Sequence, residues 1–405
     1  MKLREMKDSG IDIVKDIPQE WSLIRLKYLC SIQTGNQDTQ DADENGQYNF
    51  YVRSPIIEKS SHYTFDGEGI LMAGDGAGAG RIFHHAFGKY AVHQRVYRLS
   101  QFHNINSYYL FYYLSNLFNV EMDKGSAQST VPSVRLPMLL NFAVCIPSKE
   151  EQDKIAVFLD HKCSEIDSLT ADIQNQIEVL EEYKRSVITE AVSRGLSLNA
   201  DTEATAISWI KYKPKKWMLS KIKYEIIPLS RPVKSTDEVI TCFRDGQVTL
   251  RKYRREEGFT ISFTENGYHG VEEGDLVIHG MDTFAGAIGC SECRGKCTPV
   301  VHVCGTTGNN RYFMYYLRSL ANNGVLWFYA NGVRVRSSDF RNFANLGKFS
   351  IAVPPISEQN EIVGYLDKKC SEIDCIIADK KRQIETIEEY KRSLIFEYVT
   401  GKKEV

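Results

Sequence analysis

Cys163-Ser-Glu-Ile-Asp167 and Glu181-Glu-Tyr-Lys-Arg-Ser186 both occur again in the same chain, 207 residues later. When residues 160–186 are aligned with residues 367–393, eighteen of the twenty-seven positions are identical. A repeat at a fixed spacing is the strongest organisational signal that a single sequence contains. Because the spacing is about half of the 405 residues, the sequence predicts two copies of one architectural unit.

Each half also begins with a related landmark. Residues 18–28 and 214–224 both contain Pro-x-x-Trp followed by a basic segment that ends in Tyr. The bodies that follow, residues 22–148 and 218–356, share almost no sequence. Two copies of one scaffold are therefore expected to present two different surfaces.

Two long segments lack residues that end helices. Residues 150–194 contain neither Pro nor Gly, and residues 357–400 contain only Gly364. Apolar residues in both recur at alternating steps of three and four, which is the pattern of a coiled coil. The first seam comprises Ile155, Leu159, Ile166, Leu169, Ile173, Ile177 and Leu180. The second comprises Ile362, Leu366, Ile373, Ile376, Ile384 and Ile387.

Three arrangements would bury these seams. Each helix could cover its own domain, or it could join two copies of the chain. Alternatively, the two helices could pair antiparallel within one chain, which buries both seams without a second molecule. The near-identity of the two segments favours this pairing, which would place the two bodies at opposite ends of a rod.

The bodies are predicted to mix helices and strands. Short apolar runs before Gly-rich turns are typical of strands, whereas residues 106–118 and 310–320 are rich in Tyr, Phe and Leu and are typical of helices. We therefore expect an α+β fold with two pseudo-symmetric mixed domains separated by an antiparallel intramolecular coiled coil. The expected segments are a first domain (1–148), a first helix (149–196), a second domain (197–355) and a second helix (356–405).

Composition is that of a globular protein, with 42% hydrophobic and 25% charged residues. The chain has no apolar run of the ~18–20 residues that a membrane span needs, and its start is unlike a signal peptide. We therefore expect no membrane association, a cytoplasmic location and ten reduced cysteines. The net charge of −2 does not indicate nucleic-acid binding, but basic residues gather within 211–223 and 244–255, and a neutral total can conceal a basic face.

Motifs for catalysis or nucleotide binding are missing. Gly74-Asp-Gly-Ala-Gly-Ala-Gly80 fits neither the dinucleotide fingerprint nor the P-loop, so a flexible turn is the better interpretation. Asp66, Glu68 and Asp75 could be assembled into a nuclease site, but the second body has no matching cluster. No signature of a hydrolase, zinc protease, deaminase or amino-methyltransferase occurs.

A cysteine-rich stretch contains ligand types that suit zinc: Cys290, Cys293, Cys297, His302 and Cys304. Zinc sites usually pair two short ligand hairpins across a longer loop, whereas these residues crowd together. A thiol-rich hairpin without metal is therefore the favoured interpretation, and zinc binding is the alternative.

Basic, amide and hydroxyl side chains in expected loops are candidates for DNA contact. Arg pairs with guanine, Asn and Gln pair with adenine, and Ser and Thr bind phosphates, although most such loops are simply solvated. Candidates in the first half are Arg53, Arg81, Arg95, Lys124, Ser126, Gln128, Ser129 and Thr130. Those in the second half are Arg244, Arg251, Lys252, Arg254, Arg255, Asn331, Arg334, Arg336 and Ser337.

Taken together, the landmarks resemble the specificity (S) subunit of type I restriction-modification systems (HsdS-like) over essentially the whole chain. They are Lys7-Asp-Ser-Gly-Ile followed by Pro18-x-x-Trp21, the Pro-x-x-x-Glu-Gln-x-x-Ile passages at 147–155 and 354–362, and the duplicated helices. One departure is a lysine in the second Pro-x-x-Trp motif, where the family usually has an acidic residue.

The resemblance implies a subunit without catalysis of its own. Each body would be a target-recognition domain for one half of a bipartite sequence in double-stranded DNA, and the helices would set the separation and recruit partners. Those partners would be modification (methyltransferase) subunits, two of them, which flip an adenine and use S-adenosylmethionine, and a restriction subunit that translocates with ATP and Mg²⁺. No cofactor or metal is expected on this chain.

Two other classes of function stay open at this point. A stand-alone nuclease or methyltransferase would act without partners, and a coiled-coil scaffold would not bind DNA. The target sequence, its spacer length and the presence of a working restriction subunit do not follow from the sequence, because base readout depends on loop geometry.

Overall fold

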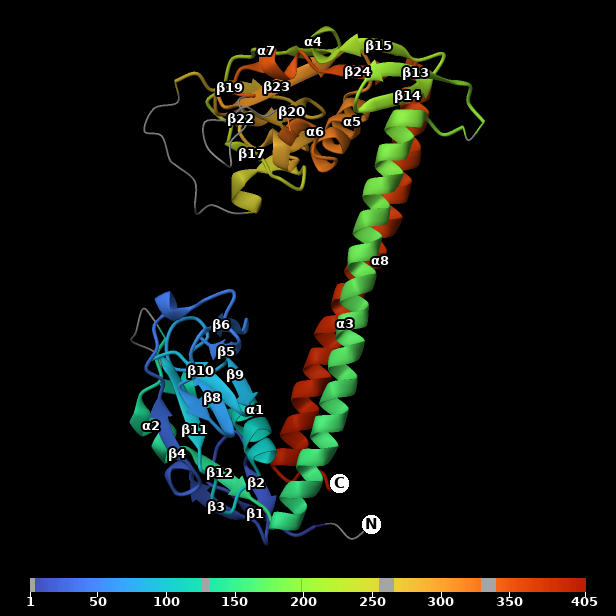
Figure 1. Cartoon of the computed structure of the whole chain (residues 1–405). Coiled ribbons are helices and arrows are strands. Elements are labelled where there is room, and N and C mark those ends of the chain that lie inside the picture. Colours follow the sequence, from blue (N-terminus) through green and yellow to red (C-terminus); the bar gives the residue numbers. More distant parts are fainter. Residues whose placement is uncertain (1–3, 126–131, 198, 255–265, 329–339) are drawn as a thin grey trace. The chain divides into compact units, whose positions relative to one another are not determined.

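The chain folds into two compact units, which a computed structural model describes over residues 4–125, 132–197, 199–254, 266–328 and 340–405. Unit 1 comprises residues 1–174 and 381–405, and unit 2 comprises residues 175–380. Each unit therefore contains one body and one segment of each long helix (Figure 1).

Unit 1 is built on two four-stranded sheets. The central sheet is antiparallel throughout, in the order β4-β11-β8-β9, and the second has the order β6-β5-β10-β7 with β5 and β10 parallel. All five residues of the central strand β8 are buried, as expected for a strand covered on both faces. The central strands are β4 (Ser31–Thr34), β8 (Gly69–Ala73), β9 (Phe83–Ala86) and β11 (Val96–Ser100). Those of the second sheet are β5 (Tyr48–Tyr51), β6 (Glu58–Ser60), β7 (Phe65–Asp66) and β10 (Lys89–Val92).

Smaller elements connect these sheets to the long helices. A hairpin opens unit 1, and a two-stranded pair of β3 and β12 leads directly into the first long helix. These strands are β1 (Met6–Asp8), β2 (Asp16–Pro18), β3 (Ser22–Arg25) and β12 (Ala143–Ile146). The helices are α1 (Ser107–Gly125) and α2 (Leu136–Asn141), with short 3-10 turns η1 (Leu26–Tyr28) and η2 (Thr39–Asp41).

Unit 2 repeats this plan with different residues. Its central sheet has the order β16-β23-β20-β21, and β15 pairs with β24 before the second long helix. Its strands are β13 (Thr202–Ile207), β14 (Ile210–Pro214), β15 (Met218–Lys221), β16 (Ile226–Pro228), β17 (Ile240–Cys242), β18 (Val248–Leu250), β19 (His269–Val271), β20 (Leu276–His279), β21 (Ile288–Cys290), β22 (Gly295–Cys297), β23 (Val301–Thr306) and β24 (Ser350–Val353). Its shorter helices are α4 (Ile222–Glu225), η3 (Arg251–Tyr253), η4 (Thr283–Ala285), α5 (Asn310–Asn322), α6 (Val325–Phe328) and α7 (Phe343–Leu346).

The two bodies share one topology although they share almost no sequence. Strands β16, β23, β20 and β21 correspond in order to β4, β11, β8 and β9. A parallel bridge from Val239 to Lys296 places β17 beside β22, as β5 lies beside β10 in unit 1. The predicted pseudo-symmetry of two mixed domains is therefore confirmed.

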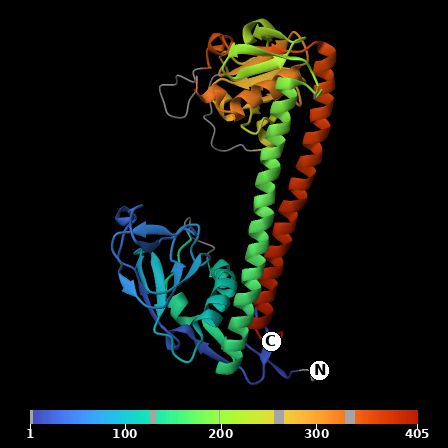
Figure 2. The same cartoon turned by 45° about the vertical axis from the view of Figure 1, so that its right-hand side comes forward.

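The long helices are α3 (Lys149–Arg194) and α8 (Ile356–Val399), with 46 and 44 residues. Within each unit, a segment of α3 and a segment of α8 lie side by side (Figures 1 and 2). Lys391 Nζ lies 2.5 Å from Asp167 in unit 1, and Lys184 Nζ lies 2.6 Å from Asp374 in unit 2. These equivalent ion pairs require antiparallel helices, so the predicted intramolecular pairing is confirmed.

The buried seam differs from the predicted one at two equivalent positions. The side chains of Leu169 and Ile376 are 50% and 45% exposed. At ~3.6 residues per turn, the inward position after Ile166 is Thr170, and Ile377 occupies the equivalent position in α8. The seam residues that are buried are Ile155, Leu159, Ile173, Ile177, Ile362, Leu366 and Ile373. Those that are partly buried are Ile166, Leu180, Ile384 and Ile387.

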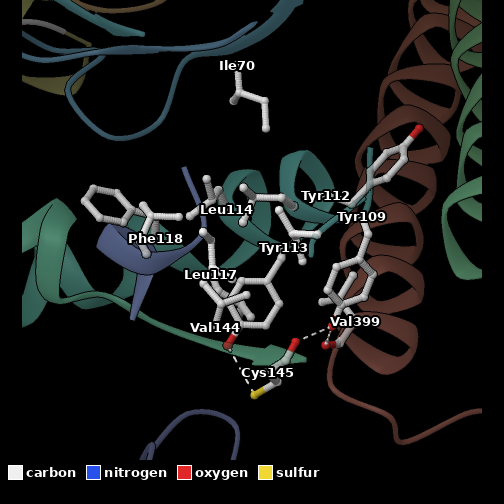
Figure 3. Packing of buried hydrophobic residues seen from close by; sticks show 14 of the residues in the cluster. Ile70, Tyr109, Tyr112, Tyr113, Leu114, Leu117, Phe118, Val144, Cys145 and Val399 are labelled. Carbon is white, nitrogen blue, oxygen red and sulfur yellow. Dashed lines mark hydrogen bonds between the residues drawn. The ribbon is translucent and has the colours of Figure 1, made fainter. Parts of the chain in front are cut away.

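One tyrosine in each unit ties a body to both long helices. In unit 1, the Tyr109 hydroxyl hydrogen-bonds the carbonyls of Cys145 and Val399, at 2.7 and 3.0 Å (Figure 3). In unit 2, the Tyr312 hydroxyl lies 3.2 Å from the carbonyls of both Val192 and Ala352. Buried carbonyls need such donors, and the last carbonyls of a helix lack partners within the helix.

Two sequence landmarks explain how these helices begin and end. The Gln152 amide accepts a hydrogen bond from Asn106 N and donates one to the Pro147 carbonyl, so it anchors the start of α3 beside α1. Gln359 makes the equivalent bonds to Asn309 N and the Pro354 carbonyl. The Gln of the repeated Pro-x-x-x-Glu-Gln motif therefore fixes the start of each long helix against its own body.

The tryptophan of each Pro-x-x-Trp motif packs against a glycine that ends a long helix. Gly401 and Gly195 have φ angles of 70° and 78°, in the left-handed region. A Cβ on Gly401 would lie 3.1 Å from Trp21, and one on Gly195 would lie 3.3 Å from Trp217. Only glycine adopts this backbone conformation without strain at a helix end.

We expect Gly195→Ala to lower the free energy of unfolding, because a side chain in the left-handed region costs ~1–2 kcal/mol and its Cβ would lie 2.9 Å from Glu358 Oε1. Gly364→Ala is the matched control in the same unit, since nothing lies within 4 Å of its Cβ. That change should stabilise α8 by ~1 kcal/mol. Urea unfolding followed by circular dichroism measures both, and equal effects would contradict the assignment.

Candidate nucleic-acid interface

Three candidate arginines of unit 1 are exposed around the turn that follows β8. Arg53 follows β5, and its Nη1 lies 2.9 Å from Asp75 Oδ1. Arg95 precedes β11, and its Nη1 lies 3.7 Å from the other carboxylate oxygen. Arg81 lies between β8 and β9, at the end of the same turn. The carboxylate of Asp75 is thus shared by two arginines that are far apart in sequence.

The polypeptide returns to this turn just after residues 126–131. Gly76 N donates to the Pro132 carbonyl at 3.0 Å, and Val134 N donates to the Gly74 carbonyl at 2.7 Å. Ser126, Gln128, Ser129 and Thr130 lie outside the described residues, and for Lys124 only the backbone, in the last turn of α1, is described. The expected loop therefore ends beside the arginine cluster.

Unit 2 places its arginines in a similar way. Arg244 follows β17, and its Nη2 lies 2.9 Å from Asp282 Oδ1, after β20. Arg254 pairs with Asp245 at 2.6 Å, and its guanidinium lies 4.3 Å from the ring centroid of Phe243.

Two further candidates of unit 2 already have partners within the body. Arg251 Nε donates to Thr241 Oγ1 at 3.1 Å, and Lys252 Nζ lies 2.5 Å from Glu238. Arg255, Asn331, Arg334, Arg336 and Ser337 lie outside the described residues.

The segment after residues 329–339 also returns to the turn after β20. The Phe340 carbonyl lies 2.7 Å from His302 Nε2. A Cβ on Gly280 would lie 2.9 Å from the Arg341 Cα, which shows how closely the backbone approaches the turn. Unit 2 therefore brings the C-terminal end of its candidate loop and an arginine–aspartate pair to one place, as unit 1 does.

The lysines within 211–223 do not form one uncompensated basic face. Lys213 is buried, hydrogen-bonds the Trp217 carbonyl at 2.6 Å and pairs with Glu203. Lys215 and Lys216 lie 3.5 and 3.0 Å from carboxylates of Asp201 and Glu358. Their spacing in the sequence suggested a basic cluster, but the fold supplies acids from other segments.

The described residues of the cysteine-rich stretch do not gather into a set of metal ligands. Burial raises the pKa of Cys290 and Cys297 to about 12. The ring of His302 is engaged by the Phe340 carbonyl. Among the residues that the structure describes, no three or more His, Cys, Asp or Glu side chains are placed to bind a metal ion, Asp66, Glu68 and Asp75 included.

Sequence reasoning missed the aspartates of this interface. Arg53 and Asp75 are 22 residues apart, whereas Arg244 and Asp282 are 38 residues apart. No common spacing links the two pairs, and Asp75 stood out in the sequence only as a scattered carboxylate. The shared position is visible only after the two folds are compared.

Comparison with known proteins agrees with this architecture. Residues 18–179 match the family model of the type I restriction modification DNA specificity domain. The EcoDI specificity subunit of Escherichia coli is 26% identical over 181 residues, which are 45% of this chain and 40% of that protein. The MjaVIII specificity subunit of Methanocaldococcus jannaschii is 25% identical over 65% of this chain and 64% of that protein. The matches thus span less than two thirds of either relative.

A solved structure extends the similarity of fold to nearly the whole chain. It comes from work on complex assembly and conformational transition of the type I R-M system, and it has a TM-score of 0.65 at 12% identity. The alignment covers 96% of this chain and 99% of that one. In the part of the chain that the structure describes, no helix is long and apolar enough to cross a membrane. Residues 18–179 thus match a type I restriction modification DNA specificity domain, and the chain is similar to type I specificity subunits in sequence and shares its fold with a solved type I R-M structure.

Proposed function

We propose that this chain is the sequence-reading subunit of a type I restriction-modification complex. Each body binds one half of a bipartite target in double-stranded DNA. The observation that carries this proposal is that two bodies with dissimilar sequences share one topology. Each body brings arginines and the end of a candidate loop to the turn after its central strand, β8 or β20. Arginines at loops are suited to base edges and phosphates. The match of residues 18–179 to the type I specificity domain supports the same assignment.

The repeated helices carry the proposed sites for partner subunits. Leu169 and Ile376 are exposed at equivalent positions, and so are Tyr183 and Tyr390, which are 52% and 59% exposed. Unit 1 contains Leu169 with Tyr390, and unit 2 contains Ile376 with Tyr183. Exposed apolar side chains that recur in both copies suit two equal partners. We assign them to two modification subunits.

In this proposal the partner subunits, and not this chain, catalyse methylation and cleavage of DNA. Methyl transfer from S-adenosylmethionine takes place on the modification subunits, and ATP- and Mg²⁺-dependent cleavage takes place on a restriction subunit, in the cytoplasm. Neither a stand-alone nuclease or methyltransferase nor a scaffold without DNA binding accounts for the duplicated reading surfaces. Methylation or cleavage of DNA by the purified chain alone, given S-adenosylmethionine or Mg²⁺, would contradict this assignment.

Replacing residues 22–148 with the equivalent body of another family member should change one half-site and leave the other unchanged, because each body reads its own bases. Methylome sequencing of cells that carry the gene and its modification partner reports both half-sites directly. The reciprocal replacement of residues 218–356 is the matched control and should change only the other half-site. A change in both half-sites after one replacement would rule out modular reading.

We also propose that the length of the paired helices sets the spacing between half-sites. Removing four residues from each helix, 171–174 and 378–381, shortens each by ~6 Å. Since B-DNA rises ~3.4 Å per base pair, the spacer should shorten by about one or two base pairs while the half-sites stay the same. The same methylome measurement tests this, and altered half-site bases with an unchanged spacer would refute it.

A further inference from the structure

An arginine–aspartate pair occupies the same place in both bodies. Arg53 and Arg244 each lie two residues after corresponding strands, β5 and β17. Asp75 and Asp282 each follow the corresponding central strands, β8 and β20. In both pairs, a guanidinium nitrogen lies 2.9 Å from a carboxylate oxygen.

The recurrence does not come from the repeated sequence. The two pairs have different spacings, 22 and 38 residues, and lie in the bodies that share almost no sequence. Stability alone gives little reason for such a pair, because the side chains of Arg53 and Arg244 are 45% and 64% exposed. Exposed ion pairs typically contribute little to folding. A role outside folding is therefore the better explanation.

The surroundings of both pairs are those of a binding surface. Each turn begins with a glycine that admits another backbone: a Cβ on Gly74 would lie 2.8 Å from the Arg95 carbonyl oxygen, and one on Gly280 would lie 2.8 Å from the Val300 carbonyl oxygen. The candidate loop of each body returns at this turn, through Ser133 in unit 1 and Arg341 in unit 2. The arginine, the aspartate and the loop end are thus held together by the backbone.

The chemistry of the pair suits exchange with DNA. The carboxylate accepts the same guanidinium N–H groups that guanine O6 and N7, or a phosphate, would accept. The carboxylate offsets one positive charge at the surface, although in unit 1 it is shared with Arg95, and it repels phosphates. Because non-specific binding depends on net positive charge, the pair weakens attachment to the wrong sequence.

We propose that Arg53 and Arg244 are base-contacting residues of the two bodies. Asp75 and Asp282 hold these arginines in the free protein and suppress binding to non-target DNA. This inference rests on the proposed DNA-reading function and specifies which residues perform it. The arginine exchanges its carboxylate partner for a guanine edge only where the correct base is present.

The test uses the full chain co-purified with its modification subunits and a pool of duplexes that contain forty random base pairs. Bound duplexes are selected and sequenced for each variant. Arg53→Gln should abolish the preference for at least one base pair of a single half-site, with about tenfold weaker binding to the selected sequence. Arg244→Gln should do the same at the other half-site only.

Arg53→Lys separates charge from geometry. Lysine keeps the positive charge but lacks the planar pair of donors that binds guanine. This variant should show a weakened preference at the same base pair, intermediate between the unmodified chain and Arg53→Gln, while it keeps the salt dependence of binding. If Arg53→Lys and Arg53→Gln both keep the full base preference of the unmodified chain, the direct-contact role is overturned.

Asp75→Asn tests the restraining role of the carboxylate. Removing the negative charge should strengthen binding to a fixed non-target duplex several-fold and steepen the slope of log K against log salt by about one unit. A purely structural ion pair predicts a lower unfolding temperature with unchanged DNA binding, and that result would overturn the inference.

Arg25→Gln and Lys221→Gln are the matched controls for the two units. Arg25 and Lys221 end the equivalent strands β3 and β15, which pair with β12 and β24 outside the central sheets. Neither change should alter base preference. If the unmodified complex selects a bipartite sequence but folded Arg53→Gln selects the same one with equal affinity, this inference is wrong and the proposed function stands. If the unmodified complex selects no sequence, the proposed function itself fails.

Discussion

Each unit depends on one constraint: the start of one long helix and the end of the other together close its core. In unit 1 the Tyr109 hydroxyl makes both contacts, because it hydrogen-bonds the carbonyl of Cys145, just before α3, and the carbonyl of Val399, at the end of α8. Tyr312 does the same in unit 2. An unpaired buried carbonyl or hydroxyl is costly, so neither body is complete with the helix that follows it alone. The antiparallel pairing follows from this requirement.

This constraint explains why the same sequence landmarks occur in both halves of the chain. Trp21 and Trp217 each pack on the glycine that ends a helix, and Gln152 and Gln359 each anchor the helix that begins beside it. These contacts involve side chains and backbone of the scaffold rather than the reading surface. The bodies between them are free to change sequence as long as the strands keep their order and the tyrosine keeps its place.

Local periodicity explains how much of the fold could be predicted. The seams, the helix bounds and the duplication all depend on neighbours a few residues apart, so the sequence reveals them. The choice of Leu169 and Ile376 as seam residues was wrong because alternating steps of three and four do not distinguish adjacent positions at one turn. The inward position is decided by what the partner helix presents, which the periodicity of one segment does not contain.

Electrostatic partners were the harder part of the candidate site. Six lysines close together in sequence suggested a basic face, yet the buried Lys213 is used to hold a loop, and acids from distant segments compensate others. Arg53 and Arg244 were identified as candidates by residue type alone, and their aspartates were not. Ion pairs between segments far apart in sequence depend on strand order, and strand order is a property of the whole domain.

The division of unit 1 between the two ends of the chain also bears on synthesis. Its body is translated before unit 2, whereas residues 381–405, which include Val399 and Gly401, are translated after unit 2. Unit 2 lies within residues 175–380. The body of unit 1 therefore emerges from the ribosome before that of unit 2, but its core is completed only after unit 2 has been translated, and until then its apolar surface for α8 stays uncovered.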